Sequence, residues 1–158
     1  MALRLDQAGA DGLVLFNRWA QPDVDIESLT VQGGFGLSSP VDGRLPRTWI
    51  AALRGRVRAS LAGTGGVETA DDVVRYVLAG ADVVMSTSSL VRNGPVHSAS
   101  LVYGLTEWLS RKGFDSIDEA RGLLSVPADV DATAYERAGY VSILQDAAQR
   151  YGSLSSAT

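Results

Sequence analysis

The chain contains no cysteine, only one histidine and only one lysine among its 158 residues. The absence of cysteine excludes disulfide bonds, thiolate metal ligands and cysteine nucleophiles, and it fits a reducing compartment. With a single imidazole, a zinc site would have to be built from carboxylates, so we expect no metal site. The histidine, His97, lies near a predicted helix start, where a solvated or capping role is favoured over that of a general base.

Long hydrophobic runs and clustered positive charge are also missing. No window approaches about 18 uncharged apolar residues, and Asp6 and Asp11 interrupt the N-terminus where a signal peptide needs an apolar core. The formal net charge is −4, from 14 basic and 18 acidic residues mixed along the chain. A nucleic-acid or anionic-membrane surface would need clustered Lys and Arg. We therefore expect a cytoplasmic protein with neither a nucleic-acid nor a membrane partner.

The composition that is present, 46% apolar and 20% charged, is that of a globular protein. A short internal repeat organises it, "QAGADGLVLF" at 7–16 and "LAGADVVMST" at 78–87. In both copies a helical pattern ends at Ala-Gly-Ala-Asp and a continuous apolar run follows. Gly9 and Gly80 therefore lie where a left-handed helix C-cap is expected.

Three apolar runs predict strands: Leu13–Phe16, Ala59–Ala62 and Val83–Met85. Because apolar and polar residues do not alternate in them, we predict strands that are buried on both faces, as in parallel sheets. Helical patterns separate the runs. The alternation of helix and buried strand predicts an α/β fold with right-handed crossovers.

The predicted helices carry recognisable start signals. Thr69 and Asp72 predict an N-cap pair that opens "ADDVVRYVLAG", and Trp49 shares an apolar face with its neighbours in "RTWIAALRGRV". After Pro95 we predict a helix that closes at Gly113, a second that starts with a capping box at Ser116, and a last amphipathic helix at 133–151. Residues 19–43 break the rhythm, and we predict an excursion hairpin in "DVDIESLTV" and a short fourth strand around 33–37.

A glycine-rich loop follows the run Ala59–Ala62, at Gly63, Gly65 and Gly66. Strand, glycine turn and helix N-terminus together form an anion site, because backbone N–H groups and the helix dipole face the ligand. The loop lacks the Gly-Lys-Ser/Thr of a P-loop, and Glu68 stands at the third position of the dinucleotide fingerprint. The alternative is that the loop is only a tight strand-to-helix turn.

Four hydroxyl residues, "STSS" at 86–89, follow the next predicted strand. Barrels of eight βα units commonly hold a phosphate between two consecutive loops of this kind, beside a short extra helix. The alternative is that these hydroxyls cap the following helix. Asn17 and Arg18 come directly after the run Leu13–Phe16, where such a barrel places ligand contacts.

The stretch "ASLAGTGGVETADDVVRYVLAGADVVMSTSSLVRNGP", with "GLTEWLSRKGFDSIDEARG", resembles the C-terminal part of class 1 dihydroorotate dehydrogenases. The whole chain is similar to bacterial dihydroorotate dehydrogenase-like flavoproteins through "ADGLVLFNR", the "LSSP" and "RLP" segments and "YERAGY". The resemblance covers 1–151 and implies the C-terminal half of an FMN-binding (β/α)8 TIM barrel. It implies about four βα units plus C-terminal helices, divided into a half-barrel with the FMN phosphate site at 1–126 and a C-terminal helix and tail at 127–158.

The resemblance also implies an activity, the oxidation of dihydroorotate to orotate in pyrimidine biosynthesis with hydride transfer to FMN. Ser38 and Ser39 lie in a loop where the family often has glycines, and we assign this loop to FMN as well. The second phosphate turn of the family is usually Gly-Thr, from which this chain departs. The implied FMN contacts are Gly63, Gly65, Gly66, Thr87 and Ser88, and Asn17 matches the asparagine that faces flavin and substrate.

A closed barrel of this class typically needs about 250 residues, more than this chain has. The flavin-contacting lysine and the proton-abstracting base of the family belong to the first half, and Lys112 lies at the end of a late helix. We therefore expect no catalytic residue here, inactivity of the chain alone, and a missing N-terminal half or a homo-oligomer that covers the open barrel edges. Two alternatives stay open: a non-catalytic half barrel that binds FMN or another phosphate, and a different phosphate-handling TIM-barrel enzyme.

Overall fold

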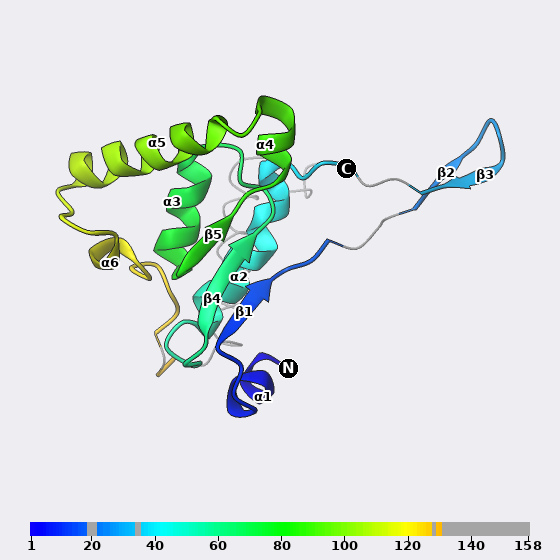
Figure 1. Ribbon diagram of the computed structural model, residues 1–158. Helices are drawn as coiled ribbons and strands as arrows, with labels where there is room; N and C mark the ends of the chain where they lie inside the picture. Colours follow the sequence, from blue (N-terminus) through cyan, green and yellow to red (C-terminus); the bar gives the residue numbers. More distant parts are fainter. Residues whose placement is uncertain (19–21, 34–35, 128, 131–158) are drawn as a thin grey trace, which may run out of the picture. The chain divides into compact units, whose positions relative to one another are not determined.

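The computed structural model describes residues 1–18, 22–33, 36–127 and 129–130 (Figure 1). The chain divides into two compact units, Met1–Ser125 and Val126–Thr158. All helices and strands of the described residues belong to the first unit. The predicted helix at 133–151 and the tail after it lie outside the described residues.

A parallel sheet of three strands forms the centre of the first unit. The strands are β1 (Gly12–Leu15), β4 (Ser60–Thr64) and β5 (Val83–Met85), hydrogen-bonded in the order β1-β4-β5. In this register Leu15 lies opposite Gly63, and Gly63 lies opposite Val84. The sequence prediction of parallel strands is confirmed, and all three strands end at the same edge of the sheet.

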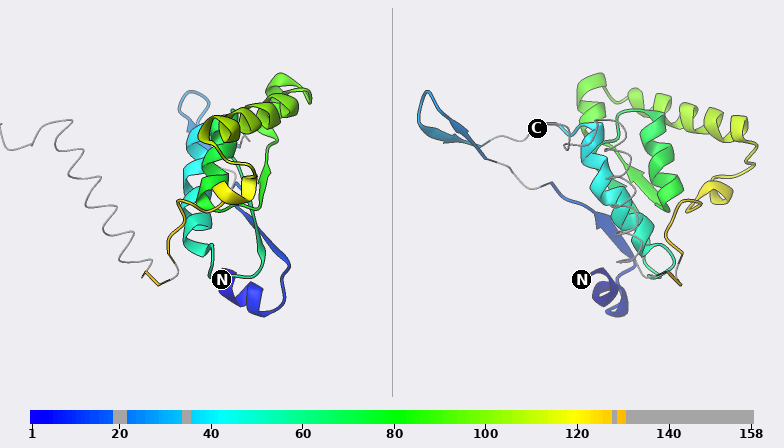
Figure 2. Two further views of the ribbon diagram at one scale, coloured as in Figure 1. Left: turned by 90° about the vertical axis from the view of Figure 1, so that its left-hand side faces the viewer. Right: turned by 180° about the vertical axis from the view of Figure 1, so that it is seen from behind.

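Helices α2 (Arg44–Leu53) and α3 (Ala70–Ala79) cover one face of this sheet (Figures 1 and 2). Their apolar stripes meet the strands in a core that includes Leu15, Ile50, Leu61 and Tyr76. Helix α3 begins at the predicted Thr69 N-cap and ends at Gly80 with φ +112°. Gly9, after helix α1 (Ala2–Gln7), takes φ +93°, so both glycines of the internal repeat are left-handed as predicted.

The described helices leave the other face of the sheet uncovered. Val14 is 60% exposed, Val83 51% and Met85 44%. The prediction that the strands are buried on both faces is therefore wrong for the described part of this chain. Its apolar runs have the composition of doubly covered strands, but the described helices pack on one face only.

The remaining helices follow the hydroxyl loop: α4 (Ser88–Asn93), α5 (His97–Lys112) and α6 (Ile117–Ala120), shown in Figure 1. Helix α5 ends at Gly113, as predicted, with φ +78°. Helix α6 has the predicted N-cap, Ser116. However, the carboxylate of Glu119 accepts the backbone N–H of Asp115, so the predicted capping box with Ser116 is not formed.

The predicted apolar face of α2 is only partly buried. Ile50 and Leu53 are 0% and 8% exposed, whereas Trp49 is 45% exposed. A helix advances by about 100° per residue, so a side chain next to the buried stripe lies at its edge. Trp108 on α5 is half-buried and stacks on Phe114 with ring centroids 5.8 Å apart.

The excursion between β1 and α2 contains the predicted hairpin. Strands β2 (Asp23–Asp25) and β3 (Thr30–Gln32) are antiparallel, with Val24 opposite Val31. The 3-10 helix η1 (Pro40–Gly43) leads into α2. No helix of the described residues is long and apolar enough to cross a membrane.

The predicted fourth strand is absent from the described residues of 33–37, and β1 pairs directly with β4. The next residue, Ser38, donates its backbone N–H to a side chain, the Oγ of Ser88, rather than to a neighbouring strand. The described residues therefore form three βα units rather than about four.

Candidate functional site

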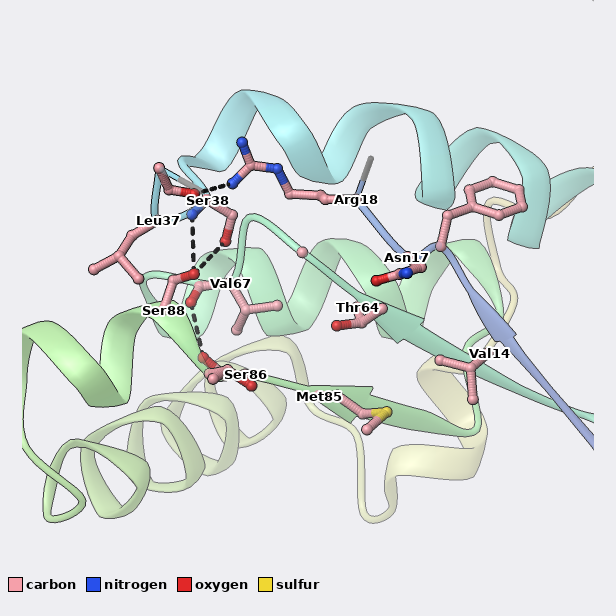
Figure 3. A pocket seen from close by; sticks show the side chains of 14 residues that line it. Val14, Asn17, Arg18, Leu37, Ser38, Thr64, Val67, Met85, Ser86 and Ser88 are labelled. Carbon is pink, nitrogen blue, oxygen red and sulfur yellow. Dashed lines mark hydrogen bonds between the residues drawn. The ribbon is translucent and has the colours of Figure 1, made fainter. Parts of the chain in front are cut away.

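A pocket of about 460 Å³ lies at the edge where the three parallel strands end (Figure 3). Ligand pockets of α/β proteins lie at this edge, and this volume is typical of small-molecule sites. Its walls combine apolar side chains with hydroxyl and amide groups. The lining residues are Val14, Phe16, Asn17, Arg18, Gly36, Leu37, Ser38, Thr64, Gly65, Val67, Met85, Ser86, Thr87 and Ser88.

The structure brings together most of the residues that the sequence singled out. Four of them line the pocket: Asn17, Gly65, Thr87 and Ser88. Asn17 follows β1, Gly65 follows β4, and Thr87 and Ser88 follow β5. Ser38, from the excursion, lines it as well. Three others do not line the pocket but support its loops: Gly63, Gly66 and Ser39.

Gly63 is needed for packing beneath the loop. A Cβ at this position would lie 2.3 Å from Cδ1 of Tyr76 and 3.0 Å from Cδ1 of Ile50. The Tyr76 hydroxyl donates to the carbonyl oxygens of Thr64, at 3.0 Å, and Gly65, at 2.8 Å. The tyrosine therefore holds the start of the glycine loop from inside, and only glycine leaves room for its ring.

Gly65 and Gly66 shape the turn. Both have positive φ, +92° and +67°, a region that glycine enters without steric strain. A Cβ on Gly66 would lie 2.4 Å from the backbone nitrogen of Gly43 and 2.8 Å from the carbonyl oxygen of Ser39. The loop is thus pressed against the segment that precedes α2, where Ser39 donates to Asp42 and caps η1.

The hydroxyl residues after β5 divide into two roles. Ser86 Oγ donates to the carbonyl oxygen of Val67 and lies 2.6 Å from Ser89 Oγ, and Ser89 is completely buried, so this pair ties the two loops together. Thr87 is the N-cap residue of α4 but makes no side-chain capping hydrogen bond. Ser88 Oγ accepts hydrogen bonds from Ser38 (Figure 3). The alternative that these hydroxyls serve to cap α4 is therefore not supported.

Two backbone N–H groups just before α3 are bound by a side chain of the helix itself. The carboxylate of Asp72 accepts the N–H groups of Glu68, at 3.2 Å, and Thr69, at 3.1 Å, and it is 1% exposed. Burial raises the pKa of Asp72, but these hydrogen bonds outweigh it and leave the pKa below its usual value. We expected backbone N–H groups at this helix start to face an anion. For Glu68 and Thr69 this expectation is wrong, because their N–H groups donate to the carboxylate of Asp72.

The charged side chains around the pocket hold its loops in place. Arg18, the one ionisable residue among those lining it, donates from Nη1 to the carbonyl oxygen of Gly36 at 2.7 Å. Arg92 pairs with Glu68 at 2.5 Å and donates from Nη2 to the carbonyl oxygen of Ser38 at 2.8 Å. Nε2 of His97 lies 2.8 Å from the carbonyl oxygen of Glu68, outside the pocket lining.

Sequence reasoning missed Tyr76 and Arg92. Neither lines the pocket, but both donate hydrogen bonds to backbone carbonyl oxygens of its loops. The signal for Tyr76 is a hydroxyl-bearing ring within the apolar stripe of 70–79; Arg92 carries no signal that separates it from the other arginines. Among the residues that the structure describes, no group of His, Asp or Glu is arranged to hold a metal ion.

Fold and pocket define the class of this protein: a partial α/β fold with a pocket where its parallel strands end. No family model matches the chain. A catalytic subunit of dihydroorotate dehydrogenase B (NAD+) from Oceanobacillus iheyensis is 33% identical over 129 residues, which are 78% of this chain and 42% of that protein. A dihydroorotate dehydrogenase (quinone) from Haloarcula marismortui is 31% identical over 113 residues, 71% of this chain and 32% of that protein.

The fold has solved counterparts too. The crystal structure of dihydroorotate dehydrogenase from Eimeria tenella in complex with ferulenol matches with a TM-score of 0.61 and 24% identity, over 75% of this chain and 32% of that one. The resemblance stated from the sequence is confirmed: the chain is related to the dihydroorotate dehydrogenase family. It spans less than half the length of the curated relatives it matches.

Proposed function

We propose that this chain is the FMN-phosphate-binding part of a dihydroorotate dehydrogenase-like flavoprotein. The observation that supports this most directly is the convergence of Asn17, Gly65 and Ser88 on one pocket, at the shared edge of three parallel strands. In this proposal Gly65, Thr87 and Ser88 hold the phosphate, while Gly63 and Gly66 shape the loop behind it. Asn17 faces the flavin and the substrate.

The residues of the pocket suit this ligand. Hydroxyl groups and a glycine loop at one end offer donors for a phosphate. The apolar side chains of Val14, Leu37, Val67 and Met85 offer surface for a flat ring system. Bound FMN would supply the hydride acceptor for the oxidation of dihydroorotate to orotate.

The described residues that line this pocket include no acid or base. Among the lining residues only Arg18 is ionisable, and a guanidinium stays protonated at all relevant pH values. Removing a proton from the substrate requires a positioned base, so a second part must supply it. We propose that this part, a complementary βα half, covers the sheet face at Val83, beside the pocket. It would pair with the outer edges of β1 and β5, which pair with no other strand among the described residues.

The experiment is a titration of the purified 158-residue chain with FMN and, separately, with riboflavin, which lacks the phosphate. We expect FMN to bind more tightly than riboflavin, measured by quenching of flavin fluorescence. Dihydroorotate added to the FMN-loaded chain should leave the flavin absorbance at roughly 450 nm unchanged, because the described residues of the pocket offer no base. Equal affinity for both flavins, or no binding, contradicts the phosphate site; bleaching by dihydroorotate contradicts the inactivity of the chain alone.

A non-catalytic half barrel that binds FMN is the second candidate, favoured by the same lack of an acid or base in the pocket. In that case a second copy of the chain is the natural cover for the open sheet face. Analytical ultracentrifugation of the FMN-loaded chain separates the two candidates. A stable homodimer supports the non-catalytic half barrel. A monomer supports the first candidate, in which a different complementary half covers the sheet.

A further inference from the structure

Ser38 connects the three loops of the pocket. Its side chain and backbone are 7% exposed, although serine is a polar residue. Its N–H and its hydroxyl both donate to Ser88 Oγ, each at 2.9 Å, and its Oγ accepts the N–H of Gly66 at 3.3 Å (Figure 3). One buried serine therefore links the excursion, the glycine loop and the hydroxyl loop.

The hydrogen bonds that Ser88 Oγ accepts determine where the hydroxyl of Ser88 can donate its own proton. A serine hydroxyl offers one donor and two acceptor lone pairs. Both donors of Ser38 point at Ser88 Oγ, so the two lone pairs are occupied. Among the described residues no acceptor receives the Ser88 proton, and Ser88 lines the pocket. The hydroxyl of Ser88 is thus left with one free function, donation into the pocket.

Ser38 is itself held from the other side. The carbonyl oxygen of Ser38 accepts Nη2 of Arg92 at 2.8 Å, and Arg92 is anchored by the carboxylate of Glu68. The position of the Ser38 hydroxyl therefore follows from its backbone as well as from its rotamer. A donor fixed in advance binds an anion without losing side-chain entropy on binding.

We propose that Ser38 is a positioning residue of the phosphate subsite: it orients the Ser88 hydroxyl so that its proton is donated to the phosphate of the bound ligand, and it holds Gly66 in the turn beside it. The proposal rests on the proposed function, because it takes the ligand to be a phosphate-bearing flavin. Ser38 acts through Ser88 and Gly66 and not through a contact with the ligand of its own.

The test compares FMN with riboflavin, because only FMN carries the phosphate. We expect Ser38→Ala to weaken FMN binding by roughly tenfold, the scale of one hydrogen bond to a charged group, and riboflavin binding by less than about twofold. Ser38→Thr keeps the hydroxyl and should restore most of the FMN affinity. Ser125→Ala is the matched control, since the Ser125 hydroxyl also donates one hydrogen bond, to the carbonyl oxygen of Gly122, but Ser125 does not line the pocket.

A double-mutant cycle separates positioning from a general loss of structure. If Ser38 acts mainly through Ser88, then Ser38→Ala should weaken FMN binding by no more than about threefold in a Ser88→Ala background. Equal losses for FMN and riboflavin, or additive losses in the cycle, overturn the positioning role while the FMN site stands. A wild-type chain that does not prefer FMN over riboflavin overturns the proposed function and this proposal together. Thermal unfolding without ligand identifies any variant whose loss of binding follows from a loss of folding.

Discussion

Replacement of Gly63 by alanine tests whether the glycine loop is built on Tyr76. The added methyl group would lie 2.3 Å and 2.4 Å from Cδ1 and Cε1 of the Tyr76 ring and 3.0 Å from Cδ1 of Ile50. Both neighbours are 0% exposed, so neither side chain can move into solvent to relieve the contact. The strand, the ring or helix α3 has to shift, and the interior of a protein is packed too densely to absorb such a shift freely.

The expected loss follows from three contributions. Overpacking of a well-packed core typically destabilises by about 1–3 kcal/mol. A displaced ring also weakens the two hydrogen bonds from the Tyr76 hydroxyl, at about 1 kcal/mol for a typical bond. Alanine restricts the unfolded chain more than glycine does, which offsets up to about 1 kcal/mol. We therefore expect Gly63→Ala to lower the free energy of unfolding by about 2 kcal/mol.

Urea denaturation followed by far-UV circular dichroism measures this loss. Gly33→Ala is the matched control, because nothing lies within 4 Å of a Cβ at Gly33 and its φ is not positive; we expect a change within about 0.5 kcal/mol. Gly63→Ala combined with Tyr76→Leu should lose less than the sum of the two single variants, since the clashing ring is gone. If Gly63→Ala is as stable as the Gly33 variant, Tyr76 does not set the requirement for glycine and the reasoning is refuted.

Two further predictions concern buried groups near the loop. Tyr76→Phe should lower the free energy of unfolding by about 1–2 kcal/mol, because two carbonyl oxygens of the loop lose their donor. Burial raises the pKa of the Tyr76 hydroxyl from 10 to about 12; the folded state thus holds this proton more tightly, and stability should fall as pH rises from 10 to 12 in the wild type but not in Tyr76→Phe. Burial raises the pKa of Asp72, yet the hydrogen bonds that its carboxylate accepts leave the folded pKa below its usual value. Asp72 therefore stabilises the fold above the unfolded pKa of about 4, and this stabilisation is lost as the pH falls through the folded pKa. Asp72→Asn should flatten this acid limb of a pH series of urea unfolding, and an unchanged limb would assign it to other carboxylates.

Local signals in the sequence were sufficient for much of the fold. The capping pair at Thr69, the left-handed glycines and the hairpin were predicted because each depends on residues close together in the chain. The prediction of a fourth strand was wrong because strand pairing depends on residues far apart in the chain. The neighbouring residue Ser38 bonds through its N–H to the side chain of Ser88, 50 residues further on, and local sequence patterns do not show such a contact.

The candidate site divides in the same way. The order of strand, polar loop and helix predicted that Asn17, the glycine loop and Ser88 follow strand ends, and the parallel sheet then brings them to one edge. The sequence did not reveal that Gly63 leaves room for the Tyr76 ring, nor that Asp72 accepts the N–H groups of Glu68 and Thr69. Both depend on which side chains meet across elements, and propensity carries no information on that.

By itself, the sequence determined the class of fold and the loops that form the pocket, because helix caps, glycine turns and apolar periodicity act over a few residues. The family to which the chain is related was indicated by the resemblance of its motifs. Only the tertiary structure decided that the described helices cover one sheet face and leave the other uncovered, and that the buried Ser38 donates both of its hydrogen-bond donors to Ser88. Those features arise from contacts between segments far apart in the chain, where the packing of the whole sheet and its helices sets the distances.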